Sequence, residues 1–493
     1  MPNRFGRTPR PALTCTPLDE RCVPAVLTVD DSGGRQFTTI AAAIAAAHPH
    51  DTIKVYAGTY AEQLHVPAAD TGLILTAAQS GVFVKSPAAV VPDTVAGFNL
   101  GGAILDLRGV GVTVTGFNFD GSTNTDGNLY AGVRVVEGGS ATIKNNTITG
   151  LTTSSDTNFG IGVEVGTRRG TGSVGTATVL NNRITNYVGA GVVVDGAGSS
   201  ATVQGNMVVG RGAANGTLAQ NGIQISFGAT GRVVANRVSQ NSATDSSAGL
   251  LFYQTPGSQN VIKNNVLDLN EAGVWLYQSG GTADRAAAVA NNTVTHSEFA
   301  GILIDTSDHV AVKNNDVGTS TVNGIASVFS SSGLIANNRT HDNGSDGIYL
   351  FSSAAPAGAT VNNVVKNNDS HGNWGNGIFL EQSSDNRVSN NRCSGNVLSG
   401  IQVLGGQNNV LLNNSLSANA ADGVLLQDAA GTAVTGNRFQ ANAGYGLRLA
   451  NADNTPVAHN KFTNSQQGSG FVSADSTGVT VTANSTDTPF VFE

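Results

Sequence analysis

VKNNDSHGNWGNGIFL at residues 365–380 is followed 23 residues later by VSNNRCSGNVLSGIQV at residues 388–403. Both stretches begin with an aliphatic residue, continue through an asparagine pair and end with a glycine that opens an alternating apolar segment. Six of the thirteen intervals between successive asparagine positions are 23 residues, and a fixed period of this kind indicates a repeat architecture. The second asparagine of each pair, or a single asparagine, occupies Asn146, Asn182, Asn206, Asn236, Asn265, Asn292, Asn315, Asn338, Asn368, Asn391, Asn414, Asn437, Asn460 and Asn484.

Each repeat contains three short strand signals. One aliphatic residue precedes the second asparagine by three positions and another follows it by two. About nine residues further on comes a strand such as Gly301-Ile-Leu-Ile. Alternation of this kind predicts strands, and the 3.6-residue period of a helix is missing. Stacked coils would bury the apolar faces and pair the backbone groups of neighbouring coils. We therefore predict an all-β solenoid, a parallel β-helix whose regular coils are best defined over 130–484.

The asparagines have two physical roles in this interpretation. Asparagine tolerates left-handed backbone angles, and stacked asparagine amides can hydrogen-bond along the stack as a ladder. A second, looser ladder is expected five residues after the first, at Asn241, Asn270, Asn343, Asn373, Asn396, Asn419 and Asn442.

The start of the chain differs from the repeats. Residues 37–47 predict a short helix, N-capped by Thr38 or Thr39, that closes the open end of the first coil. We therefore expect one β-helix domain over 26–493 and a separate, flexible segment over 1–25.

The first 25 residues lack the apolar core of an ordinary signal peptide. Residues 17–25 resemble a short tag found at the start of many large bacterial cell-surface proteins, which implies export to the cell surface or beyond. Cys15 and Cys22 are either a disulfide or two free thiols, and Cys393 falls on an inward strand position where a buried thiol is expected.

The repeat and the helix at 37–47 resemble the right-handed parallel β-helix superfamily. Its members include pectate lyases, polygalacturonases, pectinesterases, alginate epimerases and NosD-like repeat proteins. The resemblance implies a single-stranded right-handed β-helix with an N-terminal capping helix and a polysaccharide partner. The residues themselves leave the cofactor unknown, and Ca²⁺ is implied by the family resemblance only. The catalytic signatures of the enzyme families are mostly missing; Asn124-Thr-Asp matches one polygalacturonase motif, but its companions do not follow.

Composition excludes two classes of partner. The net charge is −8 and the cations are scattered, so the several phosphate contacts of a nucleic-acid-binding protein are not expected. The chain has no stretch of about 18 apolar residues, so no membrane insertion is expected. Neither the oligomeric state nor a metal ligand set follows from the sequence.

The outward positions of the Gly-apolar-x-apolar strands form an aromatic stripe. Residues two and four positions after the glycine should point away from the core. An exposed apolar strip usually marks an interaction surface, although long loops that fold over it would make it part of the core. The predicted substrate-binding residues are Tyr253, Trp275, Tyr277, Asp305, Phe351 and Phe379.

A second group of residues suits acid–base chemistry. His341 and His371 share one register position on neighbouring coils, and Asp346, Tyr349 and Glu381 lie nearby in sequence. Histidine, tyrosine and carboxylates could serve glycan cleavage, β-elimination or C5 epimerisation. The alternative is that like residues stack for structural reasons.

Three functions remain open on the sequence alone. The chain is a carbohydrate-active enzyme (a lyase, hydrolase or epimerase), a non-catalytic glycan-binding module, or a structural surface solenoid. An open groove with His341 and His371 within hydrogen-bond reach of Asp346 or Glu381 favours the first. An open groove whose histidine and carboxyl groups are already satisfied by the main chain favours the second. Burial of Trp275, Tyr349 and Phe379 favours the third.

Overall fold

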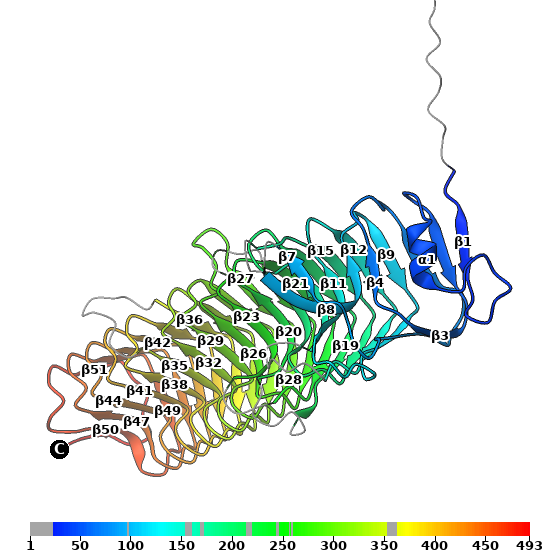
Figure 1. Ribbon diagram of the computed structural model, residues 1–493. Coiled ribbons are helices and arrows are strands. Elements are labelled where there is room, and N and C mark those ends of the chain that lie inside the picture. Colours follow the sequence, from blue (N-terminus) through cyan, green and yellow to red (C-terminus); the bar gives the residue numbers. More distant parts are fainter. Residues whose placement is uncertain are drawn as a thin grey trace, which may run out of the picture.

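The computed structural model describes residues 23–95, 98–152, 160–167, 172–212, 219–242, 246–255, 257, 260–352 and 362–493. The chain winds as a right-handed parallel β-helix, as predicted, with three long sheets that run along one axis (Figure 1). The predicted disulfide and most of the tag-like segment lie outside the described residues.

Among the described residues, sheet A has 18 strands and holds the first strand of each coil. Its strands are β1 (Val26–Val29), β2 (Thr52–Val55), β5 (Ile74–Ala77), β9 (Val112–Thr115), β12 (Ser140–Lys144), β15 (Thr176–Leu180), β18 (Ser200–Gln204), β21 (Thr230–Val234), β24 (Val261–Lys263), β27 (Ala287–Ala290), β30 (Val310–Lys313), β33 (Leu334–Ala336), β36 (Val364–Lys366), β39 (Arg387–Ser389), β42 (Val410–Leu412), β45 (Ala433–Thr435), β48 (Pro456–Ala458) and β51 (Thr480–Thr482).

In the described part of the chain, sheet B has 16 strands and follows sheet A across the asparagine turn. Its strands are β3 (Gly58–Ala61), β6 (Val82–Lys85), β10 (Asn118–Asp120), β13 (Thr147–Thr149), β16 (Arg183–Thr185), β19 (Met207–Val209), β22 (Arg237–Ser239), β25 (Val266–Asp268), β28 (Thr293–Thr295), β31 (Asp316–Gly318), β34 (Arg339–His341), β37 (Asp369–His371), β40 (Arg392–Ser394), β43 (Ser415–Ser417), β46 (Arg438–Gln440) and β49 (Lys461–Thr463).

Sheet C contains the Gly-apolar-x-apolar strands that end each coil. Its parallel strands are β4 (Leu64–Val66), β8 (Phe98–Leu107), β11 (Leu129–Val135), β14 (Ile161–Val165), β17 (Ala190–Asp195), β20 (Asn221–Ser226), β23 (Ala248–Tyr253), β26 (Ala272–Tyr277), β29 (Ile302–Asp305), β32 (Ile325–Val328), β35 (Ile348–Phe351), β38 (Ile378–Glu381), β41 (Ile401–Leu404), β44 (Val424–Gln427), β47 (Tyr445–Ala450), β50 (Gly468–Val472) and β52 (Phe490–Phe492). The short β7 (Asp93–Val95) pairs antiparallel with β8.

The inward side chains of all three sheets form one continuous core. Strands at the same position of successive coils pair in parallel, so Val312 of β30 aligns with Ile335 of β33 and then with Val365 of β36. These side chains are buried, as are their equivalents through the stack. Cys393 is among them and is fully buried, as predicted, and burial raises the pKa of its thiol.

The predicted asparagine ladder is present, and the two asparagines of each pair have different roles. The first of each pair adopts the left-handed conformation, with φ between 54° and 59° in all nine pairs. The second is buried. Asn338, for example, donates its Nδ2 to Oδ1 of Asn368 at 3.0 Å and to the carbonyl oxygen of Val312 at 3.0 Å. This bonding repeats from Asn146 to Asn484, so the amides satisfy buried backbone groups at every turn.

The second ladder is present with one interruption. Asn241 bonds Asn270, and Asn343 begins a run to Asn442. Between the two segments, Ser297 and Ser320 occupy the position; the backbone N–H of Ser320 donates to Oδ1 of Asn343.

The glycine that opens each sheet C strand is required by close approach at the corner between sheets B and C. A Cβ atom on Gly377 would lie 2.6 Å from the carbonyl oxygen of Gly400 and 2.7 Å from Cβ of Cys393. Any side chain at this position would displace either the next coil or the core, which explains why the glycine recurs.

The helix at the beginning of the chain is α1 (Ile40–Ala45), which is shorter than the predicted 37–47. Oγ1 of Thr39 accepts the N–H of Ala42, so Thr39 is the N-cap. Ile40, Ala43 and Ile44 are buried against the first strands at the N-terminal end of the stack (Figure 1).

Candidate functional site: the outer face of sheet C

The outward side chains of sheet C form two parallel files, and this orientation agrees with the prediction. In each strand the residues between the buried apolar positions are turned outward; Tyr349, for example, lies between the buried Ile348 and Leu350. Register places the file through Tyr349 as Leu251, Trp275, Leu303, Ala326, Tyr349, Phe379 and Gln402. The adjacent file is Tyr253, Tyr277, Asp305, Val328, Phe351, Glu381 and Leu404.

The aromatic rings of these files contact one another along the axis. Tyr253 and Tyr277 stack with ring centroids 5.1 Å apart, and Tyr349 lies 5.5 Å from Phe379 and 6.1 Å from Phe351. All of these rings are partly exposed. The rings therefore form two partly exposed groups, and between them lie the outward side chains of Leu303 and Ala326, which are buried.

A pocket of about 280 Å³ lies beside Trp275 on this face. Phe299, Leu303 and Val328 supply apolar walls, and Glu271 and Asp305 add carboxylates. The Nε1 atom of Trp275 is buried and has no hydrogen-bond partner among the described residues. Buried polar atoms are normally satisfied, so this unpartnered indole N–H is an exception within the fold.

The two predicted catalytic histidines lie on the outer face of sheet B. His341 and His371 stack with ring centroids 5.6 Å apart. Nδ1 of His341 is 2.8 Å from a carboxylate oxygen of Asp342, and Nε2 is 3.2 Å from one of Asp316. Within the described part of the chain, no hydrogen bond or ion pair joins either histidine to Asp346, Tyr349 or Glu381.

Of the other three predicted catalytic residues, Tyr349 and Glu381 lie on neighbouring strands of sheet C, and Asp346 lies in the turn that precedes β35. The hydroxyl of Tyr349 donates to Oε2 of Glu381 at 2.6 Å. Burial, together with the bonded Glu381 carboxylate, raises the pKa of Tyr349. Oδ1 of Asp346 accepts the backbone N–H of Asn376 at 2.7 Å and its side-chain Nδ2 at 3.0 Å. Burial raises the pKa of Asp346, and the charge of Glu381 acts in the same direction.

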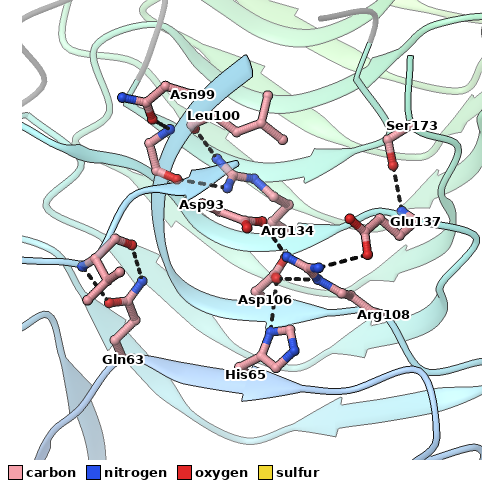
Figure 2. Close-up of polar contacts among 12 residues, drawn as sticks. Gln63, His65, Asp93, Asn99, Leu100, Asp106, Arg108, Arg134, Glu137 and Ser173 are labelled. Atoms are coloured by element: carbon pink, nitrogen blue, oxygen red, sulfur yellow. Dashed lines mark hydrogen bonds and ion pairs between the residues drawn. The ribbon is translucent and has the colours of Figure 1, made fainter. Parts of the chain in front are cut away.

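Sequence reasoning missed a charged cluster at the N-terminal end of the same face. The fully buried Arg134 donates from Nε to Oε2 of Glu164 at 2.7 Å. Its two terminal nitrogens donate to the carbonyl oxygens of Leu100 and Gly101, at 2.7 Å and 3.1 Å. These carbonyls belong to β8, so Arg134 fastens the β7–β8 hairpin over the sheet (Figure 2).

A second arginine, Arg108, also holds the hairpin in place through ion pairs. Arg108 contacts Asp93 of β7 at 2.5 Å, Asp106 at 3.0 Å and Glu137 at 2.7 Å (Figure 2). His65 approaches Asp106 at 3.1 Å. Burial would raise the pKa of Asp106, but His65, Arg134 and Arg108 outweigh that effect and hold it below its usual range. The cluster was detectable, because Gly132-Val-Arg-Val and Gly162-Val-Glu-Val carry the same strand signal as the later coils.

Three residues that border the central face were also missed. Trp374 is 70% exposed and Phe299 is 47% exposed, both in turns between sheets B and C, and Glu271 precedes β26. The signal for Trp374 is an aromatic residue within a turn of glycines and asparagines, at His371-Gly-Asn-Trp-Gly.

Comparison with protein-family models places the fold in a family. The model for the right-handed β-helix region matches residues 101–317 and 281–403, which together exceed half of the chain. The chain therefore belongs to the right-handed β-helix family. A second model, described as the periplasmic copper-binding protein NosD, matches residues 354–487. No curated protein matches the chain.

Several solved structures are similar in fold. The A-module of the mannuronan C-5 epimerase AlgE4 from Azotobacter vinelandii is 16% identical, with 90% of this chain and 92% of that chain covered and a TM-score of 0.42. The periplasmic alginate epimerase AlgG is 12% identical, covering 90% and 76%, with a TM-score of 0.30. The Dettilon tailspike protein is 15% identical, covering 78% and 62%, with a TM-score of 0.40. No function follows from likenesses of this level.

The described residues do not fit a copper site of the kind that the NosD description implies. Copper sites use clusters of His, Cys, Met or carboxylate ligands. Among the described residues, no group of three or more His, Cys, Asp or Glu side chains is placed to hold a metal ion. Cys393, the one cysteine in the matched span, is enclosed in the core.

Proposed function

We propose that this protein binds a polysaccharide along the outer face of sheet C and does not turn it over. The observation that carries the proposal is the partly exposed aromatic file that leads to the pocket at Trp275. An exposed apolar strip marks an interaction surface, and binding pockets combine apolar walls with a few polar groups. Successive coils are about 4.8 Å apart, so an extended ligand can contact several of them in turn.

The state of the acid–base groups favours binding over catalysis. A general acid or base must reach the proton that it transfers. Here His341 is held by two carboxylates, Asp346 by Asn376, and Glu381 by the hydroxyl of Tyr349. The catalytic roles predicted for these residues stay predictions, and the bonds support structural roles for them.

We further propose that the protein acts outside the cytoplasm, in the extracellular space or at the cell surface. The tag-like segment at 17–25 supports this location, as does the match of residues 354–487 to a family described as periplasmic. Among the described residues, no helix has the length and apolar character needed to cross a bilayer.

The test is a binding and turnover screen on the purified full chain. Neutral glycans, pectins, alginates and glycosaminoglycans are presented with and without Ca²⁺, and binding is measured by calorimetry. We expect Trp275→Ala and Phe379→Ala to weaken binding about tenfold each, as is typical of aromatic anchors. The matched control is Phe83→Ala, because Phe83 is an exposed aromatic residue on sheet B.

Two outcomes would overturn the proposal. New reducing ends or ultraviolet-absorbing unsaturated products, lost in His371→Ala or Tyr349→Phe, would establish an enzyme. Binding to none of the glycans, or binding that Phe83→Ala weakens as much as Trp275→Ala, would remove the outer face of sheet C as a glycan site.

A further inference from the structure

The outer face of sheet C carries charge of one sign through its central coils. Between residues 248 and 427, carboxylates lie on this face or on its border with sheet B, and no lysine or arginine does so among the described residues. The carboxylates include Glu271, Asp305, Asp346, Glu381 and Asp422.

The cations of the same span lie elsewhere on the coils. Four lie on strands of sheet A and two on strands of sheet B, and Arg285 lines a separate hollow over sheet A. The strand residues are Lys263, Lys313, Lys366 and Arg387 in sheet A and Arg339 and Arg392 in sheet B. The chain therefore separates its positive charges from the aromatic face.

The pocket at Trp275 concentrates this negative character beside an aromatic ring. Glu271 is buried and accepts the backbone N–H of Ser247 at 2.9 Å, and Asp305 accepts the hydroxyl of Thr306 at 2.8 Å. A carboxylate has about four lone-pair sites in all, so it can accept several bonds at once. An ammonium group is attracted by the face of an indole and by carboxylates at the same time, most strongly where water is excluded.

We propose that the preferred ligand is a polysaccharide with free amino groups, and that the pocket lined by Trp275, Glu271 and Asp305 binds one protonated amino sugar of it. The inference rests on the proposed function, because it names the chemistry of the glycan that the same face binds. A polyuronate is disfavoured, since over residues 248–427 its carboxylates would meet carboxylates and no arginine fork; Arg448, beside Leu425 on the next strand, lies beyond this span.

The experiment compares three oligosaccharide series of equal length by calorimetry, at a pH at which sugar amines are protonated. The series are β-1,4-linked glucosamine, its N-acetylated counterpart and α-1,4-linked galacturonate. We expect the glucosamine oligomer to bind at least about tenfold more tightly than the acetylated one, which corresponds to the energy of a hydrogen bond to a charged group. We expect the galacturonate oligomer not to bind.

Two variants that remove a charge from the pocket test whether this preference arises there. Glu271→Gln and Asp305→Asn keep an acceptor for Ser247 and Thr306 while removing the charge, so the fold should persist, which circular dichroism checks. Each should reduce glucosamine binding about tenfold and leave the acetylated oligomer unaffected. The matched control is Asp268→Asn, which removes one carboxylate charge from sheet B.

The outcomes separate the inference from the proposed function. Equal or tighter binding of the acetylated or galacturonate oligomer overturns the amino-sugar inference and leaves glycan binding standing. Binding of none of the three series overturns the inference, and the broader screen then decides the proposed function. Equal losses in Asp268→Asn and Glu271→Gln would show a general charge effect and overturn the pocket assignment.

Discussion

The two ends of one side-chain file on sheet C have opposite environments. Near the N-terminus the file contains the buried Arg134 and Glu164; Arg134 donates both to Glu164 and to carbonyl oxygens of the β7–β8 hairpin. From Trp275 to Phe379 the file contains partly exposed aromatic rings. On the inward side the two regions are alike, and Val133 and Val274 are both fully buried.

This difference teaches where the repeat constrains the sequence. Inward residues, corner glycines and ladder asparagines are fixed by the contact between coils, so they recur at both ends. Outward side chains contact only what covers the outer surface of the sheet. Their identity therefore differs wherever the covering differs. A hairpin that covers the sheet needs hydrogen-bond donors for its own carbonyl groups, whereas partly exposed rings are free to contact a ligand.

The largest effect should come from removing the arginine that fastens the hairpin. Arg134→Met leaves Glu164 and the carbonyls of Leu100 and Gly101 buried without their partner. Breaking a buried ion pair in this way costs about 3–5 kcal/mol. We expect an unfolding midpoint shifted to lower urea, and faster hydrogen exchange in β7 and β8 than in the central coils.

The paired variant Arg134→Met with Glu164→Leu provides the control. It removes both charges, and replacing a whole buried pair by apolar side chains is often close to neutral. Exchange that accelerates equally along the whole stack in Arg134→Met would contradict the local role that we assign to this arginine.

The next largest effect tests whether the inward framework is the same in both regions. Asn182→Ala and Asn338→Ala each remove an amide that donates two bonds and accepts two. Each buried group left unsatisfied costs about 1–3 kcal/mol, so we expect each variant to lose about 2–4 kcal/mol. The measurement is urea unfolding of both variants beside Asn145→Ala, which leaves the ladder intact and strains only the left-handed position.

Equal losses in the two ladder variants would show that the regions differ only in what lies outside the sheet. A loss confined to Asn338→Ala would mean that the ladder matters only where no hairpin covers sheet C, and the comparison of the two regions would then need revision.

The sequence predicted the coils and their core, but it did not predict the hydrogen-bond partners of the candidate site residues. Recurring asparagines, glycines and aliphatic residues predict the coils because like contacts repeat every coil. The outward direction of Trp275 and Tyr349 follows from the same alternation. The partners of the acid–base groups do not, because the bond from Asp346 to Asn376 joins residues 30 positions apart and depends on the lengths of the intervening turns. The hairpin was not predicted, because the first coils are irregular and lack the asparagine pair that marks the later coils.

Acid should act oppositely on the two regions. The pKa of Asp106 is lowered in the fold, so its contribution is present above its unfolded value of about 3.9 and is lost as pH falls through the folded value. The pKa of Asp346 is raised, so its contribution is present below about 3.9 and is lost as pH rises through the folded value. We therefore expect acidification to loosen the hairpin and to tighten the coil at Asp346.

Protection factors from hydrogen exchange at pH 3 and pH 7 measure both effects, compared over 98–107 and 346–351. Asp106→Asn should abolish the change in the first range and Asp346→Asn the change in the second. Asparagine already occupies the position of Asp346 in both neighbouring coils, at Asn323 and Asn376, so this variant should fold. A loss of protection in both ranges of the parent protein at pH 3 would contradict the opposite signs.

The smallest expected effect distinguishes a surface that binds through its aromatic rings from a site whose polar groups contact the ligand. Tyr349→Phe deletes the hydroxyl that donates to Glu381 and keeps the ring beside Phe379. The hydrogen bond is partly exposed, so its loss should cost about 1 kcal/mol in urea unfolding, and glycan affinity should be retained because the ring remains. Tyr349→Ala should lose affinity, and Tyr253→Phe is the matched control on the same face. If Tyr349→Phe instead lost affinity as completely as Tyr349→Ala, the hydroxyl and Glu381 would be ligand contacts, and the central face would have to be treated as a site of chemistry.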